Sequence, residues 1–336
     1  MKNGFDVIGV GALTVDIFVD YPFPYIDIQQ KKDLERYLAI PFGKTYSPII
    51  IRAGGSSGNT IAYLSKLGLK CSYFTKLGDD PFSDFLINDF KRFGVHSKKI
   101  IRERGLESGK SLILSSFGKK DTSLIVFHGS ADFLTKNDIK KEIDYLTSAK
   151  WIDISSFSSK ESIKAIEYLI KEAYKKCNIL LTPSKTMIRG FGDHVLKMLD
   201  YITAISLNEE EAKILTKKEN IFDVIKFLKK KIENGIITMG SEGIISIFKG
   251  NVYKIKAYKV KEVKNTTGAG DIVAAWFLYG LVLGLDIKDI LNYAASAASI
   301  HVRKDYVGAR SCLPRLEDIK IFLDKVRNNP VTKIKL

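Results

Sequence analysis

The sequence predicts an α/β fold in which a doubly wound, mostly parallel sheet has helices on both faces and a small β-sheet forms a lid. Three observations lead to this prediction. Apolar runs of strand length alternate with amphipathic helical stretches along most of the 336 residues. The first apolar run, residues 5–12, ends in glycines and is typical of a buried strand. Two stretches, residues 17–52 and 101–128, contain extended segments without a helix to cover them.

The elements of the core follow in order along the chain. A helix over 59–67 ends at Gly68, and a strand over 71–77 precedes a helix over 81–93 that begins at Pro81 and ends at Gly94. Beyond residue 150 the predicted strands are 151–154, 179–182, 201–206 and 235–239. The predicted helices there are 160–176, a stretch near 195–199, 209–215, 221–232, 269–283 and 287–302.

The two stretches without helices are expected to form the lid. The first contains Pro22, Pro24 and Pro41 and then an extended run over 46–52. The second has runs over 111–116 and 122–127 joined by Gly118-Lys-Lys-Asp121, which predicts a β-hairpin. We therefore divide the chain into a core of residues 1–16, 53–100 and 129–336 and a lid of residues 17–52 and 101–128.

Composition excludes several classes of protein. Hydrophobic residues make up 45% and charged residues 27%, as in globular proteins. The longest apolar run, 272–285, is interrupted by Gly280 and Gly284 and is too short for a membrane helix. No signal peptide precedes Asp6, and the three cysteines lie far apart without a CxxC pair. We expect a cytoplasmic protein without disulfides or a membrane partner.

The net charge of +15, from 53 Lys and Arg against 38 Asp and Glu, is mostly due to scattered lysines. No Arg-rich or aromatic-interleaved patch accompanies it, so we expect a solvated basic surface and no nucleic-acid partner. Such a surface also attracts anionic substrates.

The strongest motif, Asn265-Thr-Thr-Gly-Ala-Gly-Asp271, immediately precedes a long apolar helix. Its small residues leave successive backbone N–H groups accessible, and the helix start adds unpaired N–H groups and the positive end of a dipole. This arrangement favours a phosphate, which glycines allow to come close. Asp271 lies in the first turn, where a carboxylate suits the proton of an attacking hydroxyl group. The alternative is an ordinary N-cap with Asp271 stabilising the helix dipole.

Two further motifs follow predicted strands. Asn208-Glu-Glu-Glu211 has the spacing of a capping box, but carboxylates at this edge of a doubly wound sheet also hold Mg²⁺ through water. Thr238-Met-Gly-Ser-Glu-Gly243 provides glycines against which a nucleotide can lie, and the alternative is a plain turn into the run 244–248.

Two features near the lid point to a polyol. Ala53-Gly-Gly-Ser-Ser-Gly-Asn59 leads into a helix, and its Gly-Gly pair is interpreted as a hinge between lid and core. Asn59 can cap the helix or bind a hydroxyl group. Asp16, shortly after the first strand, can accept two neighbouring sugar hydroxyls, although a loop Asp is more often merely solvated.

Together with Lys76–Phe82, these motifs resemble the ribokinase-like, or pfkB, carbohydrate and nucleoside kinases, in the right order and as far as Leu313-Pro314. The resemblance implies transfer of the ATP γ-phosphoryl group to a hydroxyl group of a sugar or sugar-like substrate. It implies Asp271 as base and Gly268, Ala269 and Gly270 as anion hole, with Mg²⁺ organised by Asn208 and Glu211. The residues implied for the nucleotide are Asn208, Glu211, Thr238, Gly240, Gly243, Thr267 and Ala298, and those implied for the substrate are Asp16, Gly54, Gly55 and Asn59.

The same resemblance implies a monovalent cation such as K⁺ beside the anion hole, near Asn265, Gly308 and Ser311. The chain departs from the family in having Asn265 where the motif usually begins with Asp, and in having Thr182-Pro-Ser184 where Asp-Pro-Asn is usual. Two alternatives stay open at this point: a catalytically silent sugar- or nucleotide-binding regulator, and a nucleoside kinase. In the latter, aromatic residues of the lid would stack on a base; they are Phe42, Tyr46, Phe117 and Phe127. The alternative for these residues is packing in the core of the lid or in a homodimer formed through the lid.

Overall fold

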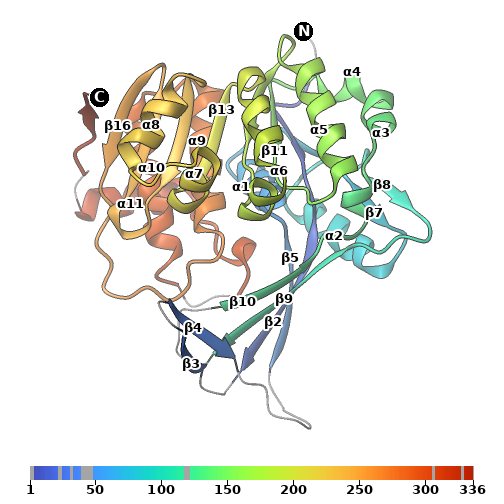
Figure 1. The fold of residues 1–336 in the computed structure, drawn as a ribbon, viewed down its shortest axis with the longest axis horizontal. Coiled ribbons are helices and arrows are strands. Elements are labelled where there is room, and N and C mark those ends of the chain that lie inside the picture. The colour runs from blue at the N-terminus through green and yellow to red at the C-terminus, as the bar shows by residue number, and fades with distance from the viewer. Residues whose placement is uncertain are drawn as a thin grey trace.

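The computed structural model describes residues 4–21, 25–30, 33–38, 48–116, 122–304, 307–326 and 329–335. A nine-stranded sheet forms the centre of the molecule (Figure 1). In spatial order its strands are β17 (Thr332–Ile334), β16 (Asn251–Ile255), β15 (Ile244–Phe248), β14 (Asn234–Thr238), β13 (Ala204–Asn208), β12 (Asn178–Leu181), β11 (Trp151–Ile154), β1 (Val7–Val10) and β6 (Cys71–Phe74). The strands from β6 to β14 run parallel, and the last three pair antiparallel. The predicted α/β fold class is therefore confirmed.

Helices cover both faces of this sheet, because its strands are apolar on both sides. Val7 belongs to the core on one face and the next residue, Ile8, to the core on the other. The helices on the first face are α1 (Ser56–Lys66), α2 (Pro81–Arg92), α9 (Ala269–Leu283), α10 (Ile287–His301) and α11 (Leu316–Val326). The helices on the second face are α3 (Lys136–Lys141), α4 (Ile143–Leu146), α5 (Lys160–Ala173), α6 (Lys185–Met198), α7 (Glu209–Thr216) and α8 (Ile221–Lys229).

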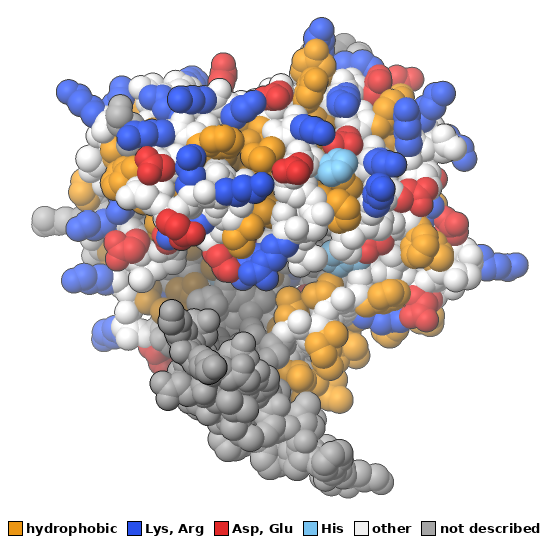
Figure 2. All heavy atoms as spheres, in the orientation of Figure 1, with side chains coloured by type: hydrophobic (Ala, Val, Ile, Leu, Met, Phe, Trp, Pro, Cys, Tyr) orange, Lys and Arg blue, Asp and Glu red, His pale blue; other side chains and the backbone are white. Residues whose placement is uncertain are grey.

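The surface agrees with the expectation of dispersed charge. On the face shown in Figure 2, Lys and Arg side chains are interspersed with Asp and Glu and do not gather in one patch. In the described part of the chain no helix is both long and apolar enough to cross a membrane. Cys71, Cys177 and Cys312 are free thiols, as predicted.

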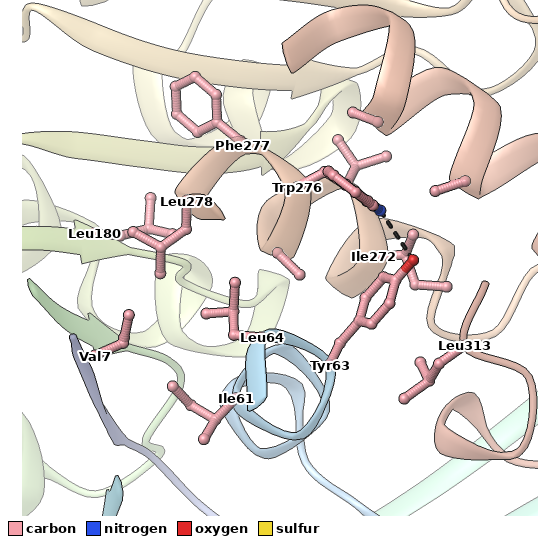
Figure 3. Close-up of a cluster of buried hydrophobic side chains, with 14 of the residues drawn as sticks. Val7, Ile61, Tyr63, Leu64, Leu180, Ile272, Trp276, Phe277, Leu278 and Leu313 are labelled. Carbon is pink, nitrogen blue, oxygen red and sulfur yellow. Dashed lines mark hydrogen bonds between the residues drawn. The ribbon is translucent and has the colours of Figure 1, made fainter. Parts of the chain in front are cut away.

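The first core is anchored where α1 crosses α9 (Figure 3). The indole Nε1 of Trp276 donates a hydrogen bond to the Tyr63 hydroxyl oxygen at 2.9 Å, and that hydroxyl donates to the Pro314 carbonyl at 2.6 Å. The two rings pack edge to face, and both side chains are fully buried. Because each polar atom is paired, these large rings add apolar burial without leaving a buried polar group unpaired.

A smaller four-stranded sheet extends from the core at the bottom of Figure 1. Its order is β10 (Thr122–Phe127), β9 (Gly109–Ser116), β2 (Thr14–Tyr21) and β5 (Ile49–Gly54), so the predicted hairpin of β9 and β10 is confirmed. We call this sheet the lid. A separate pair, β3 (Tyr25–Gln30) and β4 (Asp33–Leu38), lies in the same stretch of chain. The three lid prolines and the turn over 118–121 lie outside the described residues.

Some predicted boundaries were wrong, for physical reasons. The strand expected over 71–77 is two strands, because the chain after Thr75 leaves the main sheet and β7 (Lys76–Gly78) pairs with β8 (Ile101–Glu103). The helix expected near 195–199 spans the whole of α6, whose N-terminus is capped by Ser184. The glycines on either side of Phe191, where the backbone is not helical, had hidden its periodicity.

The lid strands also extend beyond the predicted lid segments. Strand β2 begins at residue 14 and β5 continues to residue 54, whereas β9 begins only at residue 109. The lid sheet begins with the pairing of Thr14 to Gly54 and to Gly109, only a few residues after β1 ends at Val10. The division into core and lid domains at the predicted residues stays a prediction.

Gly280 of α9 lies directly against Ile290 of α10. A Cβ atom there would lie 2.6 Å from Ile290 Cδ1 and closer still to Cγ1, and Ile290 is fully buried. Overpacking usually costs about 1–3 kcal/mol, and alanine gains about 1 kcal/mol over glycine in a helix. Because the added Cβ would collide with a fully buried side chain, the cost lies at the upper end of its range, and we expect Gly280→Ala to lower the free energy of unfolding by about 1–2 kcal/mol net. Urea unfolding tests this, with Gly190→Ala as control because a Cβ there meets no atom within 4 Å. Equal midpoints for wild type and Gly280→Ala would contradict the prediction.

Asp153 is a carboxyl group buried in the middle of the main sheet. Its Oδ2 accepts a 2.7 Å hydrogen bond from the Ser57 hydroxyl, whereas Oδ1 has no hydrogen-bond partner among the residues that the structure describes. Burial raises the pKa of Asp153 to about 7. The folded state therefore binds this proton more tightly than the unfolded state, and stability falls as pH rises from about 4 to about 7.

We expect Asp153→Asn to remove this pH dependence. The stability of the variant relative to wild type should increase with pH by roughly 1.4 kcal/mol per unit at most, and level off above about pH 7. Urea unfolding between pH 4.5 and 8.5 measures this difference. Asp6→Asn is the control, because the pKa of Asp6 is lowered by Lys150 and the Lys70 backbone despite some burial. A constant difference between wild type and Asp153→Asn would show that Asp153 does not titrate in this range.

Candidate active site

Three cavities meet at the start of α9. The lid cavity, of about 600 Å³, lies between the lid and the carboxyl ends of the core strands. The apolar cavity, of about 580 Å³, lies between the end of β14, residues 257–263 and helices α9 and α10. A connecting cavity of about 170 Å³ lies at the ends of β12 and β13. Gly270 lines all three cavities, and Asp271 lines the lid cavity and the connecting cavity.

The start of α9 presents unpaired backbone donors to these cavities. Gly268 occupies the N-cap with φ 81°, and no side chain caps the helix. A Cβ atom at Gly268 would collide with Ala309, whereas at Gly270 it would meet nothing within 4 Å. Among the described residues, the N–H groups of Gly270 and Asp271 have no backbone acceptor. An anion can therefore approach this helix end without displacing a protein group.

Asp271 is held by residues of α1. Its Oδ2 accepts a 2.7 Å hydrogen bond from the amide Nδ2 of Asn59. Burial raises the pKa of Asp271 to about 6, and hydrogen bonds from Asn59 and Ser56 and the charge of Arg310 limit the rise. The carboxyl group is thus mostly ionised at neutral pH. Its pKa is still close enough to 7 for the group to accept and release a proton.

Asp16 places a second carboxylate in the lid cavity, from strand β2. Its Oδ1 accepts hydrogen bonds from the Thr14 hydroxyl at 2.7 Å and the Ser111 hydroxyl at 2.6 Å. Burial raises the pKa of Asp16, and these hydrogen bonds oppose the rise. Oδ2 has no protein donor among the described residues and can accept from a substrate hydroxyl.

The Gly-Gly pair makes room for this arrangement. A Cβ atom at Gly54 would lie 2.5 Å from Asp16 Oδ1 and closer still to Oδ2. At Gly55, where φ is 95°, it would collide with the Ala12 carbonyl oxygen. Gly55 and Asn59 line the lid cavity, whereas Gly54 does not. These contacts account for both glycines, so the hinge interpretation is not needed to explain them.

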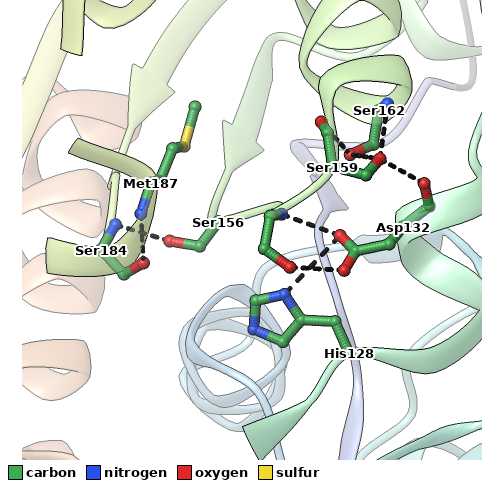
Figure 4. A network of polar contacts seen from close by, with 8 residues as sticks. His128, Asp132, Ser156, Ser159, Ser162, Ser184 and Met187 are labelled. Atoms are coloured by element: carbon green, nitrogen blue, oxygen red, sulfur yellow. Dashed lines mark hydrogen bonds and ion pairs between the residues drawn. The ribbon is translucent and has the colours of Figure 1, made fainter. Parts of the chain in front are cut away.

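A second polar wall of the lid cavity was missed in the sequence (Figure 4). It consists of Ser155, Ser156, Ser158, Ser184, Thr186 and His128. Asp132 accepts hydrogen bonds from the backbone N–H of Ser158 at 2.8 Å and from its hydroxyl, and the Ser156 hydroxyl accepts from the Ser184 N–H at 2.5 Å. Ser155, Ser156 and Ser158 follow the end of β11, and Ser184 and Thr186 follow the end of β12. Position at the carboxyl end of a parallel strand is the signal that could have identified them.

The apolar cavity contains most of the residues expected to contact a nucleotide. Thr238, Gly240, Gly243, Ala269 and Ala298 line it. Its other walls are mainly aliphatic, as suits the flat faces of a purine: Ile244, Val260, Val263, Val273 and Val302. Thr267 lies instead on the lid cavity.

Asn208 and Glu211 form a capping box at the start of α7. Asn208 Oδ1 accepts the Glu211 N–H at 2.8 Å, and Glu211 Oε2 accepts the Asn208 N–H at 2.9 Å. Both residues also line the connecting cavity, so capping and a functional role are compatible. Burial raises the pKa of the Glu211 carboxyl group, and hydrogen bonds from the backbone of Asn208 and Lys185 oppose the rise. A carboxylate engaged in this way suits contact with Mg²⁺ through water. In the described ranges, no group of three His, Cys, Asp or Glu side chains forms a direct metal site.

Asn265, Gly308 and Ser311 lie outside the linings of these three cavities. Asn265 Oδ1 accepts the Thr267 N–H at 2.8 Å. The Arg52 guanidinium donates from Nε to the Ser311 hydroxyl and to the Val307 carbonyl, both at 3.3 Å. A positive charge therefore already lies against oxygens of this loop. These residues do not fit a monovalent-cation site well, and K⁺ binding stays a prediction.

Known proteins resemble this chain in sequence and in fold. The model of the pfkB family carbohydrate kinases matches residues 49–315. A 5-dehydro-2-deoxygluconokinase of Clostridium tetani is 26% identical over 345 aligned residues, which cover 96% of this chain and 94% of that protein. Arabidopsis thaliana ribokinase, solved with ribose and ATP, superposes with a TM-score of 0.78 at 20% identity and covers 95% of this chain and 99% of its own. A putative ribokinase II of E. coli, solved with ATP and Mg²⁺, gives a TM-score of 0.78 at 19% identity, with 96% and 99% covered. This chain belongs to the pfkB family of carbohydrate kinases.

Proposed function

We propose that this chain transfers the γ-phosphoryl group of ATP to a hydroxyl group of a sugar or sugar-like substrate. The observation that carries the proposal is the placement of Asp271 and the open N–H groups of α9 where the three cavities meet. The sugar occupies the lid cavity, the adenosine occupies the apolar cavity, and the phosphates pass Gly270 between them. Retention of an acid at 271 argues against a catalytically silent regulator.

The reaction is an in-line transfer between these sites. Asp271 orients the acceptor hydroxyl group and takes its proton as the oxygen forms a bond to the γ-phosphorus. The bond from that phosphorus to the β–γ bridging oxygen breaks, and ADP leaves. Of the predicted anion hole, the Ala269 N–H already donates to the Thr266 carbonyl at 3.1 Å, so the N–H groups of Gly268 and Gly270, together with that of Asp271, stabilise the negative charge on the transferring group. Mg²⁺, held through water by Glu211 and Asn208, would neutralise charge on the phosphates.

The lid cavity favours a sugar over a nucleoside as acceptor. Asp16, Asn59 and the serine wall supply donors and acceptors for several hydroxyl groups. No Phe, Tyr or Trp of the described residues lines this cavity, so none there stacks on a base. Of the aromatics suggested for stacking, Phe127 is outside the lining and 52% exposed, and Phe42, Tyr46 and Phe117 lie outside the described residues.

The base assignment is tested by Asp271→Asn. We expect kcat to fall at least ~100-fold, the lower end for a general base, because the amide cannot accept the proton. ADP release with Mg²⁺ and ATP measures turnover, and ATP affinity should be retained. Asp286→Asn is the matched control, since Asp286 begins α10 away from the cavities and Asn caps a helix equally well. Wild-type turnover in Asp271→Asn would refute the assignment.

The acceptor is identified by a panel in the same assay. Neutral sugars, keto-sugar acids such as the substrate in the name of the Clostridium tetani relative, and nucleosides are compared with wild-type protein. Turnover of a sugar or sugar acid supports the proposal, and Asp16→Asn should then raise KM for it. Turnover of nucleosides alone would replace the proposal with the nucleoside-kinase alternative.

The outer face of the lid supports a homodimer as a further part of this proposal. Cross-strand pairs place Ile17, Ile51, Leu112 and Ile125 in one row, on the side of the sheet opposite to Asp16 and Ser111. Ile125 is 63% exposed and Ile49, in the next row, is 64% exposed. Figure 2 shows hydrophobic side chains gathered at the lower end of the described surface, where β9 and β10 lie. An exposed apolar face of this kind is best buried by a second copy of the same lid.

We expect Ile125→Lys to convert the dimer to a monomer in analytical ultracentrifugation, because a lysine in an apolar interface loses its hydration without a partner. Ile321→Lys is the control, as Ile321 is similarly exposed on α11, far from the lid in the fold. A wild-type protein that sediments as a monomer at tens of micromolar would rule out the lid dimer.

A further inference from the structure

Arg310 is a buried cation directly behind the candidate active site. It lies in a short 3₁₀ turn over residues 309–311 and is only 9% exposed. Its guanidinium donates from Nε to Asn59 Oδ1 at 3.0 Å, from Nη2 to the Gly54 carbonyl at 3.0 Å, and from Nη1 to Asp89 Oδ2. Neither the family motifs nor the lining of the cavities points to this residue.

The hydrogen bond from Arg310 decides which way the Asn59 amide faces. An arginine has only donors, so the atom of Asn59 that it contacts must be the carbonyl oxygen. The NH₂ group of the same amide is thereby directed at Asp271 Oδ2, 2.7 Å away. If the Asn59 amide were reversed, its oxygen would face a carboxylate and its NH₂ group would face a guanidinium.

The surroundings hold Arg310 in place. Its guanidinium lies over the Phe90 ring, 5.0 Å from the centroid, and Asp89 on the same helix balances its charge. A Cβ atom at Gly58 would collide with Nη2, so the glycine in the helix next to Asn59 makes space for the guanidinium. Donation from three nitrogens to three separate acceptors, combined with stacking on a ring, is specific to arginine.

Among the described residues, the other charged and titratable groups named around Asp271 carry no positive charge and therefore cannot stabilise its carboxylate as Arg310 does. Asp16 from the lid strand β2 and Asp153 from β11 are acids, and Tyr73 from β6 is a phenol. On α1, Asn59 and Ser56 are neutral donors. Arg310 is the cation whose charge acts on both Asp16 and Asp271.

We propose that Arg310 is a positioning residue for phosphoryl transfer, which acts through Asn59 to hold the Asp271 carboxylate in place and in its ionised form. The proposal deepens the function proposed above and rests on the role of Asp271 there. Arg310 itself touches neither substrate nor the reacting atoms.

The test compares two variants with wild type. Arg310→Lys keeps the positive charge and loses the planar set of guanidinium donors. The double variant Arg310→Met with Asp89→Leu removes both members of the buried ion pair, so that no charge is left unpaired. Arg303→Met is the matched control, because Arg303 also stacks on a phenyl ring, Phe322, and does not contact Asn59. Circular dichroism and the unfolding midpoint establish that each variant is folded.

The first readout is the titration of the Asp271 side-chain carboxyl carbon by ¹³C NMR, which does not depend on turnover. We expect its pKa to rise by about one unit in the double variant, by less in Arg310→Lys, and not at all in Arg303→Met, because a lost cation and a lost donor both favour the neutral acid. An unchanged titration in a folded double variant would overturn the proposal, whether or not a sugar substrate has been found.

The second readout is the pH profile of kcat with the acceptor found in the panel. A rise of one unit from about 6 lowers the ionised fraction at pH 6 by about fivefold, and the acidic limb of the profile should move accordingly. Asn59→Leu should produce the same shift, and adding it to the double variant should change the titration little further, since both act on one hydrogen bond. Full additivity would show that Arg310 does not act through Asn59 and would overturn the proposal. If the NMR shift occurs and no acceptor is phosphorylated, the action of Arg310 on Asp271 through Asn59 is supported and the proposed function is refuted.

Discussion

The packing of α1 against α9 is the contact on which both the core and the candidate active site depend. At its buried end, Trp276 and Tyr63 pack edge to face and share a hydrogen bond that continues to the Pro314 carbonyl. At its open end, the same two helices bring Asn59 to Asp271. Because interiors are close-packed, a shift of one helix along the other would disturb the core and the carboxylate together. The relative positions of Asn59 and Asp271 therefore depend on the packing of a hydrophobic interface.

The site itself is built from the ends of elements. Asp271 and the glycines open a helix, Asn208 and Glu211 begin another, and the serine wall follows a strand of the parallel sheet. Helix starts provide unpaired N–H groups, and the carboxyl ends of parallel strands leave a crevice where side chains from separate segments converge. The lid then adds Asp16 from outside the main sheet. The chemistry is thus placed where the backbone already offers donors and space.

Local sequence signals predicted the parts of this site that are local. The run from Asn265 to Asp271 contains its own turn, helix start and acid, so its geometry could be inferred from seven residues. The capping box of Asn208 and Glu211 could be predicted equally well, and its place at the ligand edge of the sheet followed from the strand that precedes it. The alternation of strands and helices predicted the doubly wound sheet because period and turn residues are encoded within each element.

The remaining features depend on distant contacts. Arg310 meets Asn59 across 251 positions of sequence, and no local pattern marks it. The serines from 155 to 158 resembled an ordinary loop in the sequence, because their hydroxyl groups line a cavity only where the lid lies opposite them. Two predicted elements were wrong for related reasons. The strand expected over 71–77 splits because the chain moves from one sheet to another, and α6 is longer than expected because it continues through a kink at Phe191. Both features are decided by tertiary packing.

Asp16 and Gly54 illustrate what such a contact means over evolutionary time. They face each other on neighbouring lid strands, and the carboxylate fills the volume that a side chain at residue 54 would need. The residue tolerated at position 54 therefore depends on the residue at position 16. A relative that shortens the residue at 16 gains room for alanine at 54, whereas a relative that keeps the carboxylate must keep the glycine. Loss of the carboxylate can thus occur by itself, whereas replacement of the glycine can only follow it, so the order of the two substitutions is constrained.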